Sequence, residues 1–195
     1  NHLFMYELVN STDSPYANDV SDESLIIVIE LSSFILITFP AQVIAVVDTI
    51  LCLDGMEVVG TCVAEELTKT DYVNINARQT IYVVTPEVIN GSQLIFRDNY
   101  APMIKGKHVL ILAVSVATGG TVKAAMEAVK YYGGEVVGVA SIFATASEID
   151  GYAVNSVFNP KDLPGYFATS SHECPLCKEG KKLDALINCH GFSKL

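Results

Sequence analysis

The sequence predicts an α/β fold, in which a mostly parallel sheet carries helices on both faces. Three continuous apolar runs of strand length, at residues 46–53, 108–114 and 136–143, are typical of strands that are buried on both sides. Helical patterns at residues 56–68 and 122–132 alternate with these runs. Strands that alternate with helices are joined by right-handed crossovers and lie parallel to one another.

The first predicted elements lead from the N-terminal segment into the sheet. Two acidic residues in the first turn indicate a helix over residues 21–38, and Pro40 ends it. The strand at residues 46–53 stops at Asp54-Gly55, a pair that is common in turns. Apolar residues then recur at four-residue spacing, which predicts the helix over residues 56–68.

Shorter elements are predicted in the middle of the chain. Residues 72–75 and 80–84 have the composition of short strands, and residues 86–92 are predicted to be a loop that carries Asn90-Gly91. We expect residues 93–96 to return as the second arm of a hairpin. The glycines that follow residue 132 end the second long helix.

The composition indicates one folded domain. The chain has 195 residues, of which 50% are hydrophobic and 17% are charged, and this is far from the composition of a disordered chain. The formal net charge is -10, and only Arg78 and Arg97 are arginines. A surface that follows nucleic-acid phosphates needs clustered lysine and arginine, so we expect no nucleic-acid partner.

No membrane association is expected either. The apolar stretch over residues 25–53 is interrupted by Glu30, Pro40, Gln42 and Asp48, so it contains no uninterrupted span of membrane-crossing length. Residues 1–11 lack the basic and apolar regions of a signal peptide. Five cysteines, an odd number, fit a reducing compartment better than a disulfide framework. The expected location is the cytoplasm.

A glycine-rich loop follows the strand at residues 108–114 and leads directly into a helix. Its sequence is Thr118-Gly119-Gly120-Thr121. Ligands of open α/β sheets bind at the carboxyl ends of the strands. Glycines let a phosphate approach the backbone, the start of the helix offers N–H donors, and the threonines add hydroxyl groups. The loop therefore predicts an anion site, and the alternative is a tight turn that needs glycine only for its dihedral angles.

At these residues the sequence resembles the type I phosphoribosyltransferases, and especially the orotate phosphoribosyltransferases. Residues 109–121 look like the family's motif for phosphoribosyl pyrophosphate (PRPP), and residues 131–139 continue the likeness with Gly-Gly-x-Val-Val-Gly. Residues 173–180 are similar to the C-terminal segment of some orotate enzymes. The resemblance covers residues 46–180.

The resemblance implies a fold, a ligand and a reaction. A parallel sheet core (residues 46–158) would carry a small cap, or hood, built from residues 1–45 and 159–195 of one phosphoribosyltransferase-like domain. Two sets of residues would hold PRPP: Ala117, Thr118, Gly119, Gly120 and Thr121 at a phosphate, and Leu53, Asp54, Gly55 and Met56 at the pyrophosphate. Magnesium would arrive with PRPP, a phosphoribosyl group would pass to orotate or a related base in pyrimidine metabolism, and the protein would be a homodimer.

The chain departs from the family's pattern at the two acidic residues of the motif, where it has Ala113 and Val114. The family's basic mobile loop would fall at residues 85–100, where Arg97 is the sole cation. Two interpretations stay open. In the first, the protein is a transferase that uses Asp54, Glu57 or Asp98 as substitute acids. In the second, it is a degenerate relative that binds a phosphoribosyl ligand or nucleotide without chemistry and has a regulatory role.

The same three carboxylates also have purely structural interpretations. Asp54 would form a turn before glycine, Glu57 would be a first-turn helix acid, and Asp98 would pair with Arg97 on the surface.

The C-terminal cysteines form a last candidate group. Cys174 and Cys177 are spaced as metal ligands, and His172 and Cys189 lie near them in the sequence. A second paired motif is absent and the resemblance explains the segment without a metal, so we expect no zinc. A redox function of the two thiols and a packed C-terminal flap are the alternatives.

Overall fold

The computed structural model describes Ile35, residues 46–68, 80–89, 93–163, Tyr166, and residues 173–182, 184–188 and 191–195. Ile35 is buried and helical. The rest of the helix expected at residues 21–38, the strand expected at residues 72–75, and the residues His172 and Cys189 lie outside this part of the chain. The cap expected at residues 1–45 lies outside it as well, Ile35 apart.

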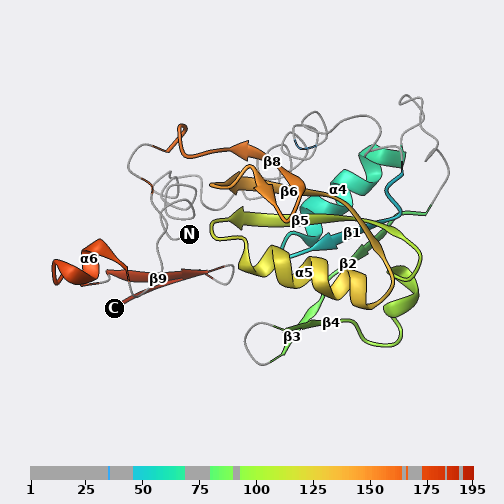
Figure 1. Cartoon of the computed structure of the whole chain (residues 1–195), viewed down its shortest axis with the longest axis horizontal. Coiled ribbons are helices and arrows are strands. Elements are labelled where there is room, and N and C mark those ends of the chain that lie inside the picture. Colours follow the sequence, from blue (N-terminus) through green and yellow to red (C-terminus); the bar gives the residue numbers. More distant parts are fainter. Residues whose placement is uncertain are drawn as a thin grey trace, which may run out of the picture.

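Within the described residues the chain folds into a sheet with a helix on each face (Figure 1). In chain order its elements are β1 (Thr49–Cys52), α4 (Glu57–Thr68), β2 (Tyr82–Val84), β3 (Glu87–Ile89), β4 (Gln93–Ile95), the 3-10 helix η2 (Ala101–Met103), β5 (His108–Val116), α5 (Gly120–Tyr131), β6 (Glu135–Ala144), β7 (Glu148–Ile149), β8 (Tyr152–Phe158), α6 (Pro175–Lys178), β9 (Ala185–Asn188) and β10 (Gly191–Lys194).

The central sheet has six strands in the order β2-β1-β5-β6-β8-β7. All neighbours pair in parallel except β7 and β8, which pair antiparallel. This is the mostly parallel sheet that the alternation of strands and helices predicts. The carboxyl ends of β1, β5 and β6 therefore lie along one edge.

Two apolar clusters, one on each face, hold the helices against the sheet. Val63 and Leu67 of α4 pack with Ile50 and Leu110 on one face. On the other face, Met126 and Val129 of α5 belong to a second cluster with Ile111. The apolar strands are thus covered on both sides, which is why their apolar residues form continuous runs and do not alternate with polar residues.

The middle of the chain differs from the prediction at one element. Residues 86–92 were expected to be a loop, but Glu87–Ile89 forms β3 and pairs antiparallel with β4. The loop prediction was wrong because β2 (Tyr82–Val84) joins the parallel sheet next to β1 and is not available as the first arm of the hairpin. The hairpin itself is present, with Gln93–Ile95 as its second arm as expected.

Beyond β6 the chain adds a hairpin that the sequence patterns did not predict. Strands β7 and β8 are joined at Asp150-Gly151, where both residues have positive φ, 49° and 86°. This backbone geometry suits a two-residue hairpin turn. Strand β8 also pairs with β6, so the hairpin widens the central sheet.

The C-terminal residues form a separate small unit. Strands β9 and β10 pair only with one another among the described strands. Tyr166, the described residue before this unit, places its ring 4.6 Å from that of Phe143, edge to face. In the described residues, no helix is long and apolar enough to cross a membrane.

Candidate functional site at the carboxyl edge of the sheet

The predicted anion loop lies between β5 and α5. Strand β5 continues to Val116, two residues further than expected, because Ser115 and Val116 remain paired with Phe143 and Ala144 of β6. Residue 119 then takes a left-handed conformation with φ 78°, and α5 begins at Gly120. This conformation strains a residue that has a Cβ, so the glycine at 119 has a backbone reason.

The N-terminus of α5 offers unpaired donors to this loop. The N-cap residue is Gly119, which has no side chain that could accept a hydrogen bond from the first turn. The N–H of Lys123 is the first to bond within the helix, to Gly119 O at 2.9 Å. The three preceding N–H groups, of Gly120, Thr121 and Val122, therefore have no acceptor within the helix, and they lie at its positive end. Such an end can bind a phosphate.

Two contacts from neighbouring elements fix the loop. The Thr145 hydroxyl, just after β6, donates to Ala117 O at 2.6 Å, and the Thr145 N–H donates to Val116 O at 2.9 Å. Ile149 of β7 packs against Gly119 so closely that a Cβ at 119 would lie 2.7 Å from its Cδ1. The loop is thus held in one shape before any ligand binds.

The charges next to the loop are paired. Lys123 Nζ lies 2.8 Å from Asp150 Oδ1, and about half of each side chain is exposed. Thr118, Gly120 and Thr121 are also exposed. An anion at the loop would therefore meet a lysine whose charge is shared with a carboxylate, together with hydroxyl and N–H donors.

A groove of about 790 Å³ begins at the same helix terminus. It runs along α5 from Gly120 toward Tyr131 and Tyr132, with Gln93 and Ile95 of β4 on its other side. A ligand held at the loop would have open space beside it.

The predicted pyrophosphate loop lies at the end of the neighbouring strand. Asp54 and Gly55 follow β1 with consecutive positive φ, 55° and 84°. The Leu53 N–H still donates to Leu112 O of β5 at 2.8 Å, so Asp54 comes next to the segment that holds Ala113 and Val114. The structure thus brings the two predicted ligand loops to adjacent strand ends, as parallel pairing requires.

Asp54 is the candidate carboxylate that lies nearest in the sheet to Ala113 and Val114, because it follows β1 beside that segment of β5. Desolvation raises the pKa of its carboxyl. Glu57 instead accepts a hydrogen bond from the Thr85 hydroxyl at 3.0 Å, just after β2, on the side of β1 away from β5. Asp98 lies in the turn before η2, and the Met103 carbonyl at the end of η2 accepts the hydroxyl of Thr49, the first residue of β1. The segment that contains Asp98 thus leads to the opposite edge of the sheet.

Ala113 and Val114 occupy apolar surroundings. Ala113 is buried with the α5 cluster, and Val114 packs against the α4 cluster. The partner of Ala113 on β6 is Ser141, which is fully buried and whose hydroxyl has no hydrogen-bond partner in the described residues.

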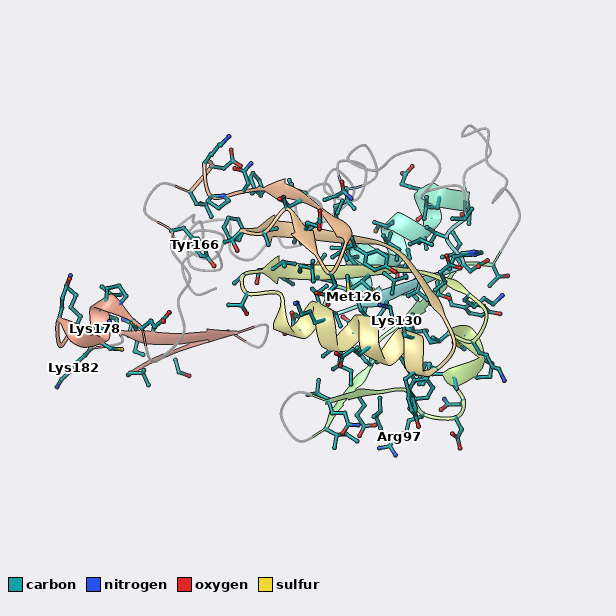
Figure 2. All side chains as sticks on the ribbon, in the orientation of Figure 1. Arg97, Met126, Lys130, Tyr166, Lys178 and Lys182 are labelled. Carbon is teal, nitrogen blue, oxygen red and sulfur yellow. The ribbon has the colours of Figure 1, made fainter. Side chains whose placement is uncertain are left out.

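Arg97 lies apart from the loop at the N-terminus of α5 (Figure 2). Its guanidinium binds both carboxylate oxygens of Glu87, at 2.6 and 2.7 Å, across the base of the β3–β4 hairpin. The expected surface pair of Arg97 with Asp98 was wrong, because the guanidinium is engaged by Glu87 instead. Arg97, the cation that the resemblance implies for the mobile loop, is therefore already paired with a carboxylate.

No group of three or more potential metal ligands occurs in the described residues. Cys174 and Cys177 are free thiols at helix α6. The other two zinc candidates, His172 and Cys189, lie outside the described part of the chain, so the expectation of no zinc stays a prediction.

The sequence patterns did not predict three residues that contact the loop or Lys123: Thr145, Ile149 and Asp150. Thr145 and Ile149 carried no recognisable signal, because they act through packing and backbone contacts. The Asp150-Gly151 pair is a hairpin signal that could have located β7 and β8 next to the loop.

The described residues thus form an α/β fold, in which a mostly parallel sheet carries a helix on each face and the two loops lie at its carboxyl edge. Part of the chain is similar in sequence to orotate phosphoribosyltransferases. It is 41% identical to the orotate phosphoribosyltransferase of Caldanaerobacter subterraneus subsp. tengcongensis over 78 residues, and these residues make up 39% of each chain. The identity to the enzyme of Sulfurimonas denitrificans is 34% over 90 residues, 40% of this chain and 44% of that protein.

The match spans about two fifths of the length of these curated relatives. No protein-family model matches the chain. Among solved structures, the adenine phosphoribosyltransferase of Thermoanaerobacter pseudethanolicus aligns with a TM-score of 0.49 and 18% identity, over 71% of this chain and 82% of that one.

Proposed function

We propose that this protein has a phosphoribosyltransferase-type function, in which the loop at residues 117–121 binds a phosphate of PRPP or of a nucleotide. The observation that carries the proposal is the uncapped N-terminus of α5, where the N–H groups of Gly120, Thr121 and Val122 have no partner within the helix. The bracing by Thr145 and Ile149 supports it, because a preformed loop loses little entropy when it binds.

Transfer of a phosphoribosyl group to orotate, with release of pyrophosphate, is the reaction that the named relatives suggest for this site. Asp54 would take over the function of the two acidic residues that the motif lacks, because it lies at the end of β1 beside the segment of β5 that holds Ala113 and Val114. Magnesium would be carried in by the pyrophosphate of PRPP, as its preference for phosphate oxygens favours.

Binding without turnover is the second candidate. It is favoured by the apolar packing of Ala113 and Val114 and by the pairing of Arg97 with Glu87. Transition states with developing charge need preorganised charges or dipoles, and an apolar pair supplies none.

Calorimetric titration with PRPP and with orotidine monophosphate, with and without magnesium, tests the proposal. A pyrophosphate-release assay with orotate then separates the two candidates. Turnover that falls at least tenfold in Asp54→Asn supports the transferase, whereas binding with no pyrophosphate release supports the second candidate. Failure of both ligands to bind overturns the proposal.

Gly120→Ala is the sharpest variant of the loop. A Cβ at residue 120 would meet only Thr118 Oγ1, at 3.9 Å, so the fold accommodates it, but the methyl group would lie where a phosphate must approach. We expect the dissociation constant for PRPP to rise by about tenfold or more, equivalent to about 1.4 kcal/mol. Thr61→Ala, at an exposed position of α4, is the matched control and should leave it unchanged.

A further inference from the structure

The turn between β7 and β8 places a carboxylate beside the phosphate loop, residues 117–121. Asp150 is the first residue of this turn and has a φ of 49°. The preceding residue, Ile149, packs so closely on Gly119 that a Cβ at 119 would lie 2.7 Å from its Cδ1. Asp150 is therefore held next to the N-cap residue of α5.

This carboxylate is paired with a lysine in the first turns of α5. Lys123 Nζ lies 2.8 Å from Asp150 Oδ1, and about half of each side chain is exposed. Residues three and four positions apart share one face of a helix, and helical side chains lean toward its N-terminus. Lys123 therefore extends along the face that begins at Gly119 and Gly120, toward the N–H groups that would bind a phosphate.

A second contact holds the hairpin against α5. Lys130 Nζ lies 5.6 Å from the ring centroid of Tyr152, the first residue of β8. Together with the packing of β7 on the phosphate loop, this contact fixes the hairpin to the helix at two points. The position of the Asp150 backbone thus does not depend on the ion pair with Lys123.

The Lys123–Asp150 ion pair bears on ligand affinity more than on the stability of the fold. A pair whose members are both half-exposed contributes little to stability, because water screens the charges. A phosphate that enters the loop, however, meets a lysine that is already neutralised. It gains a charge-assisted hydrogen bond from Lys123 only when the lysine leaves its carboxylate.

We propose that Asp150 sets the anion affinity of the phosphate loop. It holds Lys123 while the loop is empty, and Lys123 exchanges Asp150 for a ligand phosphate when the ligand binds. This inference rests on the proposed function, since it concerns the same loop. Lys123 is then a ligand-binding residue, whereas Asp150 acts through Lys123 and by repulsion of the ligand. Removal of the two charges should change the affinity in opposite directions.

Titration of Asp150→Asn and Lys123→Met with inorganic phosphate and with PRPP tests this, followed at the amide chemical shift of Gly120 in the ¹⁵N-labelled chain. Asparagine suits a positive φ before glycine, and methionine is a good helix former, so both variants keep the backbone. We expect Asp150→Asn to lower the dissociation constant by about three- to fivefold. Lys123→Met should raise it by about tenfold.

The control is Glu135→Gln, which removes one negative charge at the start of β6, on an exposed side chain at the opposite edge of the sheet. It should leave the dissociation constant within about twofold, because that charge is screened at this distance. In 1 M salt the Debye length is about 3 Å, so the difference between Asp150→Asn and the unmodified chain should narrow as well.

A merely structural ion pair gives the opposite sign. If the pair only supported the loop, Asp150→Asn would weaken binding as Lys123→Met does, and that result overturns the proposal. Equal affinities of Asp150→Asn and the unmodified chain overturn it too, while a shift of Gly120 in both chains leaves the proposed function in place. No shift of Gly120 with either probe in the unmodified chain overturns the proposed function and this inference with it.

Discussion

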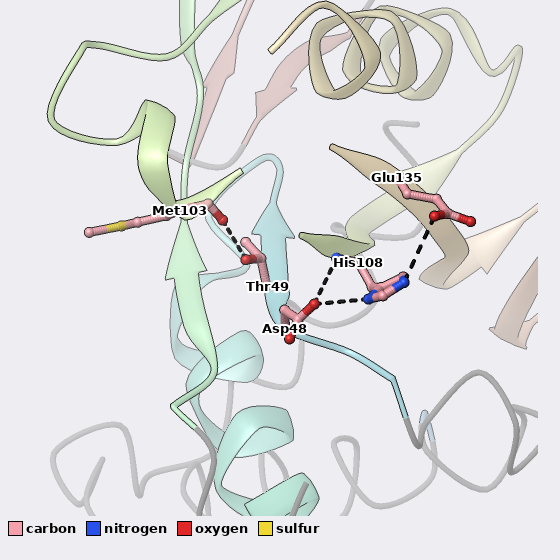
Figure 3. Close-up of polar contacts among 5 residues, drawn as sticks. All are labelled: Asp48, Thr49, Met103, His108 and Glu135. Carbon is pink, nitrogen blue, oxygen red and sulfur yellow. Dashed lines mark hydrogen bonds and ion pairs between the residues drawn. The ribbon is translucent and has the colours of Figure 1, made fainter. Parts of the chain in front are cut away.

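The Nδ1 atom of His108 lies 2.9 Å from Oδ2 of Asp48, and the same carboxylate oxygen accepts the His108 backbone N–H at 2.9 Å (Figure 3). Asp48 precedes β1 and His108 begins β5, so the contact ties together the amino ends of two parallel strands. Glu135, at the start of β6, is 3.8 Å from the other ring nitrogen. This edge lies opposite the candidate ligand loops.

The Asp48 contact gives stability that depends on pH. Desolvation alone would raise the pKa of this carboxyl, but the hydrogen bonds from His108 and the charges of Lys107 and His108 outweigh it, and the net pKa is lowered. The contribution is therefore fully present above the unfolded pKa of about 3.9 and is lost as the pH falls through the lower folded value.

We expect Asp48→Asn to reduce the free energy of unfolding at pH 7 by about 1–2 kcal/mol, as the loss of hydrogen bonds to a charged group does. Urea unfolding at pH 7 and at pH 3 checks this, and the difference from the unmodified chain should shrink at pH 3. Glu135→Gln is the control, because that side chain is 75% exposed and should change little. An equal effect of both variants would contradict the assignment.

Two buried hydroxyls should differ in how their removal changes the free energy of unfolding. Ser141 Oγ has no partner in the described residues, whereas the Thr49 hydroxyl donates to the Met103 carbonyl, and both residues are fully buried. An unsatisfied buried group costs free energy and a satisfied one stabilises. Ser141→Ala should leave the free energy of unfolding unchanged or raise it by about 1 kcal/mol, and Thr49→Val should lower it by a similar amount, measured by urea unfolding. Destabilisation by Ser141→Ala would show that the hydroxyl has a partner.

Gly119 and Gly120 are adjacent but should differ in their tolerance of a side chain. Gly119→Ala would combine a φ of 78° with a Cβ 2.7 Å from Ile149 Cδ1, and we expect a loss of about 1–3 kcal/mol. Gly120→Ala should keep or raise stability, because alanine favours a helix. Thermal unfolding of the two variants, and of Gly119→Ala with Ile149→Ala, separates backbone strain from the steric contact. Equal stabilities would refute the described loop geometry.

Cys52 should be inert toward thiol reagents in the folded chain. Burial, with a smaller effect of the Glu57 charge, raises the pKa of its thiol to about 12. At pH 8 the thiolate fraction is then about one in ten thousand. Labelling kinetics read by peptide mass spectrometry should show modification of Cys52 only at the rate at which the protein unfolds. Rapid labelling at low denaturant would contradict its burial.

The sequence predicted the central elements well because their signals are local. The continuous apolar runs that became β1, β5 and β6 reflect burial on both faces, and the glycines at 119–120 and 133–134 mark the start and end of α5. The short strands were harder. Glu87–Ile89 carries no strand pattern of its own, and its pairing with β4 depends on β2 being engaged in the central sheet.

The candidate site was predictable only in part, for a related reason. The loop residues and their position at a strand end follow from the sequence. The sequence does not show that Asp54 and Glu57 lie in different surroundings, because this depends on tertiary neighbours. Asp54 comes next to β5, whereas Glu57 accepts a hydrogen bond from Thr85. The support from Thr145 and Ile149 is a tertiary property and has no sequence signal.

Amide chemical shifts of the ¹⁵N-labelled chain during titration with PRPP and magnesium test the central claim most directly. If a phosphate binds at the N-terminus of α5, the amides of Gly120, Thr121 and Val122 will show the largest changes, while those of Asp98 and Arg97 stay in place. Largest changes elsewhere, with the α5 amides unmoved at saturation, would contradict the proposed site.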